Sequence, residues 1–218
     1  MITFIIIGIT AIISIAAFGN RTMMDKLIFQ PTEAKRGQWY RLFTYGVLHA
    51  DYMHLIFNMF TLYFFGGDIE RTFKTTFGEE AGTACYLLLY ITALPISILP
   101  TYFKQKDNVN YRGLGASGAV SAVIFAYILI NPMSFMGILF IPVWLPAFLF
   151  GIIFLLISVS LDKKQSMGIN HLAHITGSLY GIAFMVIVFI TLAHINLVSG
   201  FIDKVKVDSI NDLIRIGY

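Results

Sequence analysis

Residues 113–161 contain no aspartate, glutamate, lysine or arginine. A helix needs roughly 20 apolar residues to cross a hydrocarbon core about 30 Å thick, so this stretch is long enough for two membrane crossings. Only 12% of the chain is charged and 57% is hydrophobic, whereas about a quarter of the residues in soluble domains are charged. The sequence therefore predicts an all-α, polytopic membrane protein.

Six spans are expected where the chain carries few or no charges. Asn131-Pro132 is a turn signal, and it divides the long stretch into two spans. The spans together form one predicted domain, residues 1–202. Residues 203–218 form a charged, amphipathic tail that is expected to lie outside the membrane or on its surface. The expected spans are residues 2–18, 52–70, 81–103, 115–131, 142–161 and 170–198.

Composition argues against several kinds of partner and cofactor. The net charge of +3 is small and no basic run with interleaved aromatic residues occurs, so nucleic-acid binding is not expected. Cys85 is the single cysteine, which excludes an internal disulfide. His171 and His174 form an HxxH pair without a carboxylate, and the chain has no HExxH motif, so the signal for a metal is weak. We therefore expect no metal and no other cofactor.

Polar residues are costly inside membrane spans and usually have a function there. This chain has them near the N-terminal ends of the second, fourth and sixth expected spans. Even-numbered spans run in the same direction, so these side chains are predicted to lie on one side of the membrane at similar depth. They are His54, Asn58, Ser117, His171 and His174.

Ser117 and His174 have the chemistry of a nucleophile and its base. Serine is a weak nucleophile until a base, usually histidine, takes its proton. Gly115 and Gly118 leave room for a substrate carbonyl beside the backbone. The free N–H groups at the start of a helix suit a developing oxyanion. These residue types therefore favour nucleophilic catalysis at Ser117.

Other residues add to this pattern without deciding it. His54 and Asn58 are four residues apart on one helix face, and both can donate hydrogen bonds to the same oxyanion. Gly177 and Gly181 form a small-residue face that permits close packing against a neighbouring helix. Each feature also has a purely structural interpretation, with the glycines and serine as packing residues and the histidines as structural hydrogen-bonding groups. Taken singly, the residues leave both interpretations open.

Taken together, the motifs resemble the rhomboid family of intramembrane serine proteases. The resemblance covers almost the whole chain, in the same order. Any one motif is a weak signal, whereas the ordered set is specific. The motifs are Trp39-Tyr40-Arg41, His54-Leu-Ile-Phe-Asn58, Gly66-Gly67 with Glu70, Gly115-Ala-Ser117-Gly118 and Ala173-His174-Ile-Thr-Gly177-Ser-Leu-Tyr-Gly181.

The resemblance implies a serine endopeptidase with a Ser117–His174 dyad and no acidic third member. It implies that the oxyanion is bound by His54, Asn58 and the backbone N–H of Ser117. The implied substrates are single-span membrane proteins, cut in or near their transmembrane segment within the lipid bilayer. The first loop is implied to be a partly membrane-inserted hairpin, and residues 140–161 a lateral gate. Structural support is implied for Arg41, Glu70, Gly115, Gly118, Gly177 and Gly181.

Two features depart from what the family leads us to expect. Many members have an aromatic residue one turn after the nucleophile, beneath the imidazole, where this chain has Ser121. The resemblance also implies a bacterial inner (cell) membrane, with the active site opening to the extracytoplasmic side. The loops on that side carry ten lysines and arginines against five on the other, so the positive-inside rule favours the reverse orientation. Leaving out the membrane-embedded first loop gives a tie, and we expect the family orientation.

Two other functions are weighed against the protease. A catalytically weak or inactive relative would bind and escort membrane proteins, but such relatives typically lack the serine or the histidine, and this chain has both. A small transporter or channel would carry charged residues deep in several spans, where this sequence has none. The sequence predicts neither the natural substrate nor the oligomeric state.

Overall fold

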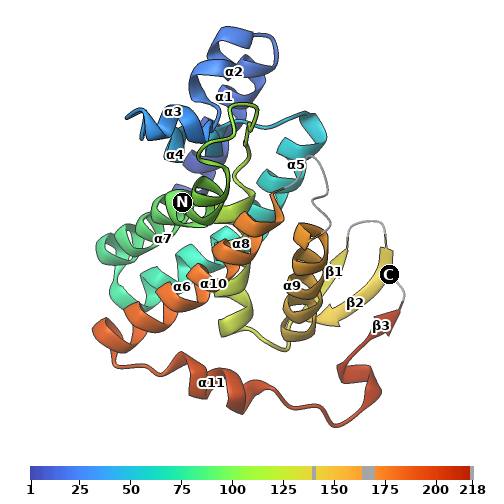
Figure 1. The fold of residues 1–218 in the computed structure, drawn as a ribbon. Coiled ribbons are helices and arrows are strands. Elements are labelled where there is room, and N and C mark those ends of the chain that lie inside the picture. Colours follow the sequence, from blue (N-terminus) through green and yellow to red (C-terminus); the bar gives the residue numbers. More distant parts are fainter. Residues whose placement is uncertain (139–140, 164–169, 217–218) are drawn as a thin grey trace.

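The computed structural model describes residues 1–138, 141–163 and 170–216. Lys164, one of the basic loop residues counted above, and the last two residues of the tail lie outside this description. Helices form the body of the molecule, and a small sheet and a C-terminal segment flank it (Figure 1). The main helices are α1 Ile2–Phe18, α5 Tyr52–Thr61, α6 Gly67–Phe77, α7 Glu79–Gln105, α8 Ser117–Ile130, α9 Ala147–Lys163, α10 His171–Val188 and α11 Leu197–Lys204.

The first loop contains short helices rather than extended chain. Asn20 begins the first of them by accepting a hydrogen bond from the backbone of Met23, a common way to start a helix. Pro31 occupies the first turn of the second, where its missing N–H costs nothing. The short elements are α2 Arg21–Leu27, α3 Pro31–Lys35, α4 Arg41–Thr44 and a 3₁₀ turn over Tyr45–Val47.

Several helices have the length or composition of membrane spans. Within the described residues, Glu79–Gln105 and His171–Ala193 are long and apolar enough to cross a membrane, and Ile2–Phe18 and Ser117–Ile130 are shorter apolar helices. Helices α5 and α6 are joined by a π-helical turn over Leu62–Gly66, so this helix continues beyond the expected end at residue 70. Charged residues mark the end of the apolar stretch, whereas the helix itself continues to Phe77.

The last apolar helix ends before the expected residue 198. Helix α10 continues as a π-helical turn over Phe189–Ala193, and His194 then adopts a left-handed conformation with φ of 57°. A left-handed residue at this position ends a helix. Asn196 starts α11 directly afterwards, because its side chain accepts hydrogen bonds from the backbone of Val198 and Ser199. One apolar stretch therefore gives two helices.

A three-stranded antiparallel sheet lies beside α9, and the expected all-α architecture does not include it (Figure 1). Proline disfavours a helix interior because it lacks an N–H donor, although α7 accommodates Pro95 and Pro100. Pro142 and Pro146 lie in the strand that precedes α9, which begins at Ala147 and not at the expected residue 142. Gly137 pairs with Trp144 and leaves room for the indole ring. The strands are β1 Phe135–Ile138, β2 Ile141–Pro146 and β3 Arg215–Ile216, in the order β1-β2-β3.

The C-terminal tail is attached to the body at two places. Lys204 Nζ donates to the carbonyl oxygen of Ile130, 2.7 Å away, and so satisfies an end carbonyl of α8. Strand β3 pairs with β2, and the Arg215 guanidinium lies 3.7 Å from the centre of the Phe135 ring. The described part of the tail is therefore an ordered strap along one end of the molecule.

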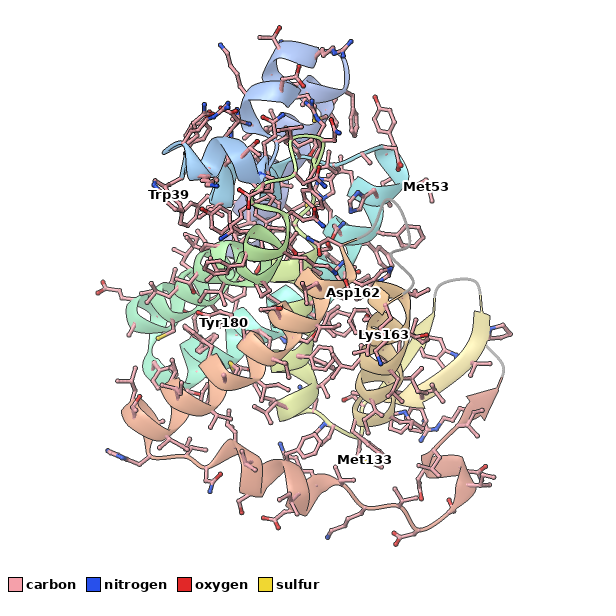
Figure 2. All side chains as sticks on the ribbon, in the orientation of Figure 1. Trp39, Met53, Met133, Asp162, Lys163 and Tyr180 are labelled. Atoms are coloured by element: carbon pink, nitrogen blue, oxygen red, sulfur yellow. The ribbon has the colours of Figure 1, made fainter. Side chains whose placement is uncertain are left out.

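Helix α8 lies at the centre of the fold and contacts α10, α7, α9 and α5. It is buried on nearly every face, and α10 crosses in front of it in Figure 1. Helix α10 is also joined to α7 by a hydrogen bond between Tyr180, labelled in Figure 2, and Thr92. The N-terminal ends of α8 and α10 come together in this packed core.

Candidate active site

Ser117 and His174 lie in direct contact. Ser117 is the first residue of α8, and His174 lies in the first turn of α10. The serine Oγ is 2.8 Å from the imidazole Nε2, a hydrogen-bonding distance. Both side chains are partly exposed. The two residues singled out as nucleophile and base are thus brought within reach of proton transfer, although 57 positions separate them.

Glycines allow α8 and α10 to approach this closely. A Cβ atom on Gly177 would overlap the carbonyl oxygen of Gly118, and one on Gly181 would overlap the carbonyl oxygen of Ala122. The two helices therefore pack backbone against backbone along this face, as small residues permit. Because Gly118 directly follows Ser117, the same contact fixes the distance between serine and histidine.

Gly118 also faces α7 on its other side. A Cβ atom there would overlap the Ser97 side chain. Ser97 lies 3.2 Å from the hydroxyl of Tyr45, which donates to the carbonyl oxygen of Leu94 at 2.8 Å. The first turn of α8 is therefore confined by α10 on one side and by α7 on the other.

Backbone hydrogen bonds hold the glycine-rich loop that precedes Ser117. Phe29 and Gly113 exchange two N–H···O bonds of 2.9 Å, and Gly115 donates to the carbonyl oxygen of Tyr45 at 3.0 Å. Gly115 has φ of +111°, a conformation that side chains rarely adopt, which explains a glycine at this position. The first loop thus provides the partners that this buried turn needs.

Two ion pairs join the first loop to the chain before Ser117. Lys35 lies 2.5 Å from Asp107, and Arg112 pairs with Asp25. The hydrogen bond from Lys35 lowers the pKa of the Asp107 carboxyl, with a smaller contribution from charge attraction. Both pairs are exposed, so they set position more than stability.

His54 lies against Gly115, beside the serine. A Cβ atom on Gly115 would be 2.8 Å from Cε1 and 3.0 Å from Nε2 of His54, and 3.9 Å from the Ser117 Oγ. The backbone N–H of Ala50 points to Nδ1 of His54 at 3.4 Å. A neutral imidazole with Nδ1 as acceptor carries its proton on Nε2. This tautomer places an N–H donor beside Gly115, two residues before the serine.

Asn58 is buried and partly engaged within its own helix. Its Nδ2 donates to the carbonyl oxygen of His54 at 2.9 Å, and the residue is 7% exposed. An amide nitrogen has two hydrogens, so one remains for another acceptor. The structure thus leaves Asn58 with a donor on the same helix as His54, one turn further from the helix start.

Asn170 is a residue whose importance the sequence analysis missed. Its Oδ1 accepts from the backbone of Ala173 at 3.0 Å, and its Nδ2 donates to Thr101 at 3.0 Å and to the Tyr111 hydroxyl at 3.1 Å. It therefore fixes the start of α10, four residues before His174, to α7 and to the glycine-rich loop. The preference for asparagine just before a helix was the available signal.

Arg41 joins parts of the first loop. Its Nη1 donates to the carbonyl oxygens of Asp25, at 2.9 Å, and Ile28, at 2.6 Å, and its Nε donates to Gln38 at 2.7 Å. The residue is 5% exposed. This buried guanidinium is therefore satisfied by backbone and amide oxygens rather than by a carboxylate.

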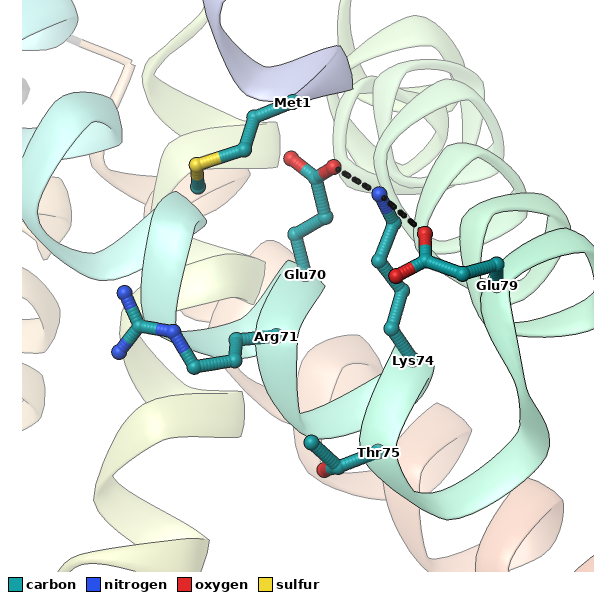
Figure 3. Close-up of a pocket in the computed structure, with 6 residues that line it drawn as sticks. All are labelled: Met1, Glu70, Arg71, Lys74, Thr75 and Glu79. Atoms are coloured by element: carbon teal, nitrogen blue, oxygen red, sulfur yellow. Dashed lines mark ion pairs between the residues drawn. The ribbon is translucent and has the colours of Figure 1, made fainter.

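Glu70 fixes the beginning of α1 to α6. Its carboxylate accepts hydrogen bonds from the backbone of Ile2 at 2.9 Å and of Thr3 at 3.0 Å, and from the Thr3 hydroxyl at 2.7 Å. Lys74 forms ion pairs with both Glu70 and Glu79 (Figure 3), and each N–O distance is 3.0 Å. A carboxylate at a helix N-terminus is favourable. Glu70 therefore connects α1 to α6, and none of its described contacts is with Ser117 or His174.

Two further histidines border the site. His49 is fully buried, and its Nδ1 is hydrogen-bonded to the Ser14 hydroxyl at 2.9 Å. Its ring lies edge-on to that of His54, with ring centroids 4.9 Å apart. Burial lowers the pKa of His49 to about 3, so this side chain is neutral. His171 lies edge-on to His174 at 5.8 Å. Neither contacts the serine in the described interactions.

The aromatic ring that stacks on His174 comes from α9. Phe154 has its ring centroid 6.0 Å from the imidazole, at an interplanar angle of 28°. Ser121, one turn after Ser117, is 3% exposed and lies in the helix interface. Sequence reasoning noticed the missing aromatic residue at Ser121 but did not identify Phe154.

Comparison with known families shows which family the chain belongs to. The rhomboid domain matches residues 36–191, a range that includes His54, Asn58, Ser117 and His174. The chain belongs to the rhomboid family. Membership makes it a polytopic membrane protein of a family whose members are mostly serine proteases.

Several known rhomboid proteins are similar to the chain. The RHOMBOID-like protein 12, mitochondrial, of Arabidopsis thaliana is 30% identical over 169 residues, which cover 74% of this chain and 50% of that protein. Rhomboid protease GlpG of Pectobacterium atrosepticum is 25% identical over 188 residues, covering 81% and 58%. Rhomboid protease GluP of Bacillus subtilis is 33% identical over 114 residues, covering 52% and 18%. The match spans half the length of the Arabidopsis relative and less than two thirds of the length of each of the other two.

Proposed function

We propose that this rhomboid protein is an intramembrane serine endopeptidase that works through a Ser117–His174 dyad. The observation that carries the proposal is the 2.8 Å contact between the serine Oγ and the imidazole Nε2. A nucleophile and a base in hydrogen-bond contact are the recognisable core of serine catalysis. The proposed reaction is hydrolysis of a peptide bond in or near the transmembrane segment of a membrane-protein substrate.

The proposed mechanism follows from the positions of these atoms. As Ser117 Oγ attacks the scissile carbonyl carbon, His174 Nε2 takes the serine proton, and the carbonyl oxygen becomes an oxyanion. His174 then gives the proton to the leaving amine, and an acyl-enzyme remains. His174 then deprotonates a water molecule that attacks the acyl carbon, and it returns the proton to Ser117 Oγ as the ester bond breaks and the carboxylic acid product leaves.

The oxyanion would be bound by groups at the start of α8. The backbone N–H of Ser117 lies at a helix N-terminus, where the helix dipole favours negative charge. The Nε2–H of His54 and the second N–H of Asn58 would supply further donors. Arg41, Glu70 and the four site glycines would act by holding the surrounding elements in place.

The setting of the reaction is also a proposal. We place the six apolar segments, from α1 to α10, across a bacterial cell membrane, with the start of α8 opening to the extracytoplasmic side. Substrates would be single-span proteins whose helix unwinds locally, since a peptide bond inside an intact helix is not accessible to the serine. Ser121 is the residue that motivates the alternative, an inactive escort protein, whereas the aligned dyad favours the protease.

Labelling with a fluorophosphonate tests the proposal without a known substrate. The purified full-length protein in detergent is treated with the probe, alongside the variants Ser117→Ala, His174→Ala and Ser121→Ala. Covalent labelling of wild type and of Ser121→Ala, and its loss in the other two, is the expected result. Labelling that survived Ser117→Ala, or a folded wild type that did not react, would sink the assignment.

A further inference from the structure

The aromatic ring that stacks on His174 belongs to a third helix of the site. Phe154 is a residue of α9, whereas Ser117 and His174 belong to α8 and α10. Its ring is close to parallel with the imidazole, at 28°. Such offset aromatic contacts have a defined geometry and restrict both rings. A third helix therefore contributes to the orientation of the proposed base.

Phe154 is itself held by the core. Its ring centroid lies 5.9 Å from that of Phe125, at 51°. Phe125 lies on α8, two turns after Ser117, and is 3% exposed. The ring of Phe154 thus contacts the helix of the nucleophile as well as the side chain of the base.

One narrow face of α9 carries these contacts. Ala147, Gly151, Phe154 and Ser158 follow a helical spacing, and the first two and Ser158 are buried. A Cβ atom on Gly151 would lie 3.4 Å from the ring of Phe125, so α9 lies close to α8 here. Much of the rest of the helix faces outward, including Ile152, Leu156, Ile157 and Val159.

We propose that Phe154 is a positioning residue that holds the imidazole of His174 in the orientation that meets Ser117. This inference rests on the proposed function, because it assigns Phe154 a part in the reaction of that dyad. The ring reaches His174 only while α9 is packed against α8. Displacement of α9 withdraws the ring, so the position of α9 and the alignment of the base change together.

Fluorophosphonate inactivation kinetics of the full-length protein test the inference. The variants are Phe154→Leu, which removes the ring, Phe154→Tyr, which retains it, and the control Phe150→Leu on the same helix, whose side chain packs against the Phe125 cluster. For Phe154→Leu, the maximal inactivation rate is expected to fall about five- to tenfold, with little change in probe affinity. Phe154→Tyr and Phe150→Leu are expected to react like wild type.

A spectroscopic readout separates this inference from the proposed function. In the Ser117→Ala background, histidine labelled with ¹⁵N reports on the imidazole by NMR, and His174→Asn identifies its signals. Loss of the ring current in Phe154→Leu should shift the His174 signals, whereas Phe150→Leu should not. If wild type fails to react but the shift is seen, the proposed function fails and takes the catalytic role of Phe154 with it, although the contact stands.

Three results would overturn the inference while leaving the protease intact. One is a Phe154→Leu variant with the maximal rate of wild type, and another is an unshifted His174 signal. The third is an equal loss of rate in Phe154→Leu and Phe154→Tyr, which would show that local packing rather than the ring matters. If Phe154→Leu does not fold, Phe154→Met supplies apolar volume without a ring.

Discussion

Gly177 of α10 lies against the carbonyl oxygen of Gly118 in α8, the residue that follows Ser117. A backbone carbonyl cannot rotate away as a side chain can. The separation of the two helices is therefore set by the absence of a single methyl group, and the contact between serine and histidine depends on that separation.

Adding the methyl group should separate the dyad. Gly177→Ala is expected to lower the free energy of unfolding by about 1–3 kcal/mol, as overpacking does, and to abolish most fluorophosphonate labelling. Gly200→Ala on α11 is the matched control, since a Cβ atom there meets nothing within 4 Å. Wild-type labelling by Gly177→Ala would contradict the backbone contact.

Asn170 should affect the reaction without touching the serine. Asn170→Ala removes a helix cap and two side-chain hydrogen bonds, and we expect a loss of about 1–2 kcal/mol in unfolding free energy. Labelling should slow, because the start of α10 is released from α7. Asn196→Ala removes the equivalent cap of α11 and should leave the labelling rate unchanged. Equal slowing in the two variants would refute a specific role for Asn170.

Glu70 should matter for stability more than for the reactivity of the serine. Glu70→Gln replaces a charged acceptor of three hydrogen bonds, and we expect thermal unfolding to show a loss of about 2–3 kcal/mol. Glu80→Gln, on the exposed start of α7, is the control and should have almost no effect. A Glu70→Gln variant as stable as wild type would show that the Glu70 carboxylate does not stabilise the fold.

His49 should make stability depend on pH. Burial, with a smaller contribution from His54, lowers the pKa of His49 to about 3 from the ordinary 6.5, against an opposing effect of Asp51. Between these values the unfolded chain binds a proton that the folded chain does not. Stability is therefore full above pH 6.5 and falls as pH decreases, by about 2 kcal/mol from pH 7 to pH 5.

Unfolding measured across this pH range checks the effect. His49→Gln should reduce the slope, whereas His194→Asn, at an exposed left-handed position, should keep it. Identical slopes in wild type and His49→Gln would show that other groups cause the acid sensitivity.

The sequence predicted family membership, and the domain match over residues 36–191 confirms it. This part was predictable because the motifs are local. Residues four apart on a helix share a face, so His54 and Asn58 can be assigned to one side of a helix before any tertiary contact is known. The apolar composition of the spans is similarly a property of each segment alone.

The β-sheet could not be predicted in the same way. Apolar residues without alternating polarity fit a buried strand as well as a helix, and 135–146 is such a segment. Its third strand is supplied by Arg215 and its neighbour, far along the chain. The prolines at 142 and 146 were a weak signal against an early helix start, because Pro95 and Pro100 lie inside α7.

Phe154 could not be singled out because α9 contains other phenylalanines, Phe148 and Phe150, in the same apolar run. Which ring meets His174 depends on how α9 is rotated about its axis against α8 and α10. That rotation is a tertiary property, set by contacts such as Gly151 against Phe125.

The contact of α8 with α10 through bare backbone has a consequence for how sequences of this kind can diverge. Where two side chains meet, a larger residue on one helix can be matched by a smaller one on the other. Gly177 and Gly181 meet carbonyl oxygens, which every residue possesses, so no change on α8 can make room for a larger neighbour. The face of α9 is different, because side chains meet there and can be exchanged in pairs. Sequence variation would therefore accumulate more readily on α9, while the two helices that carry the serine and the histidine stay tightly packed.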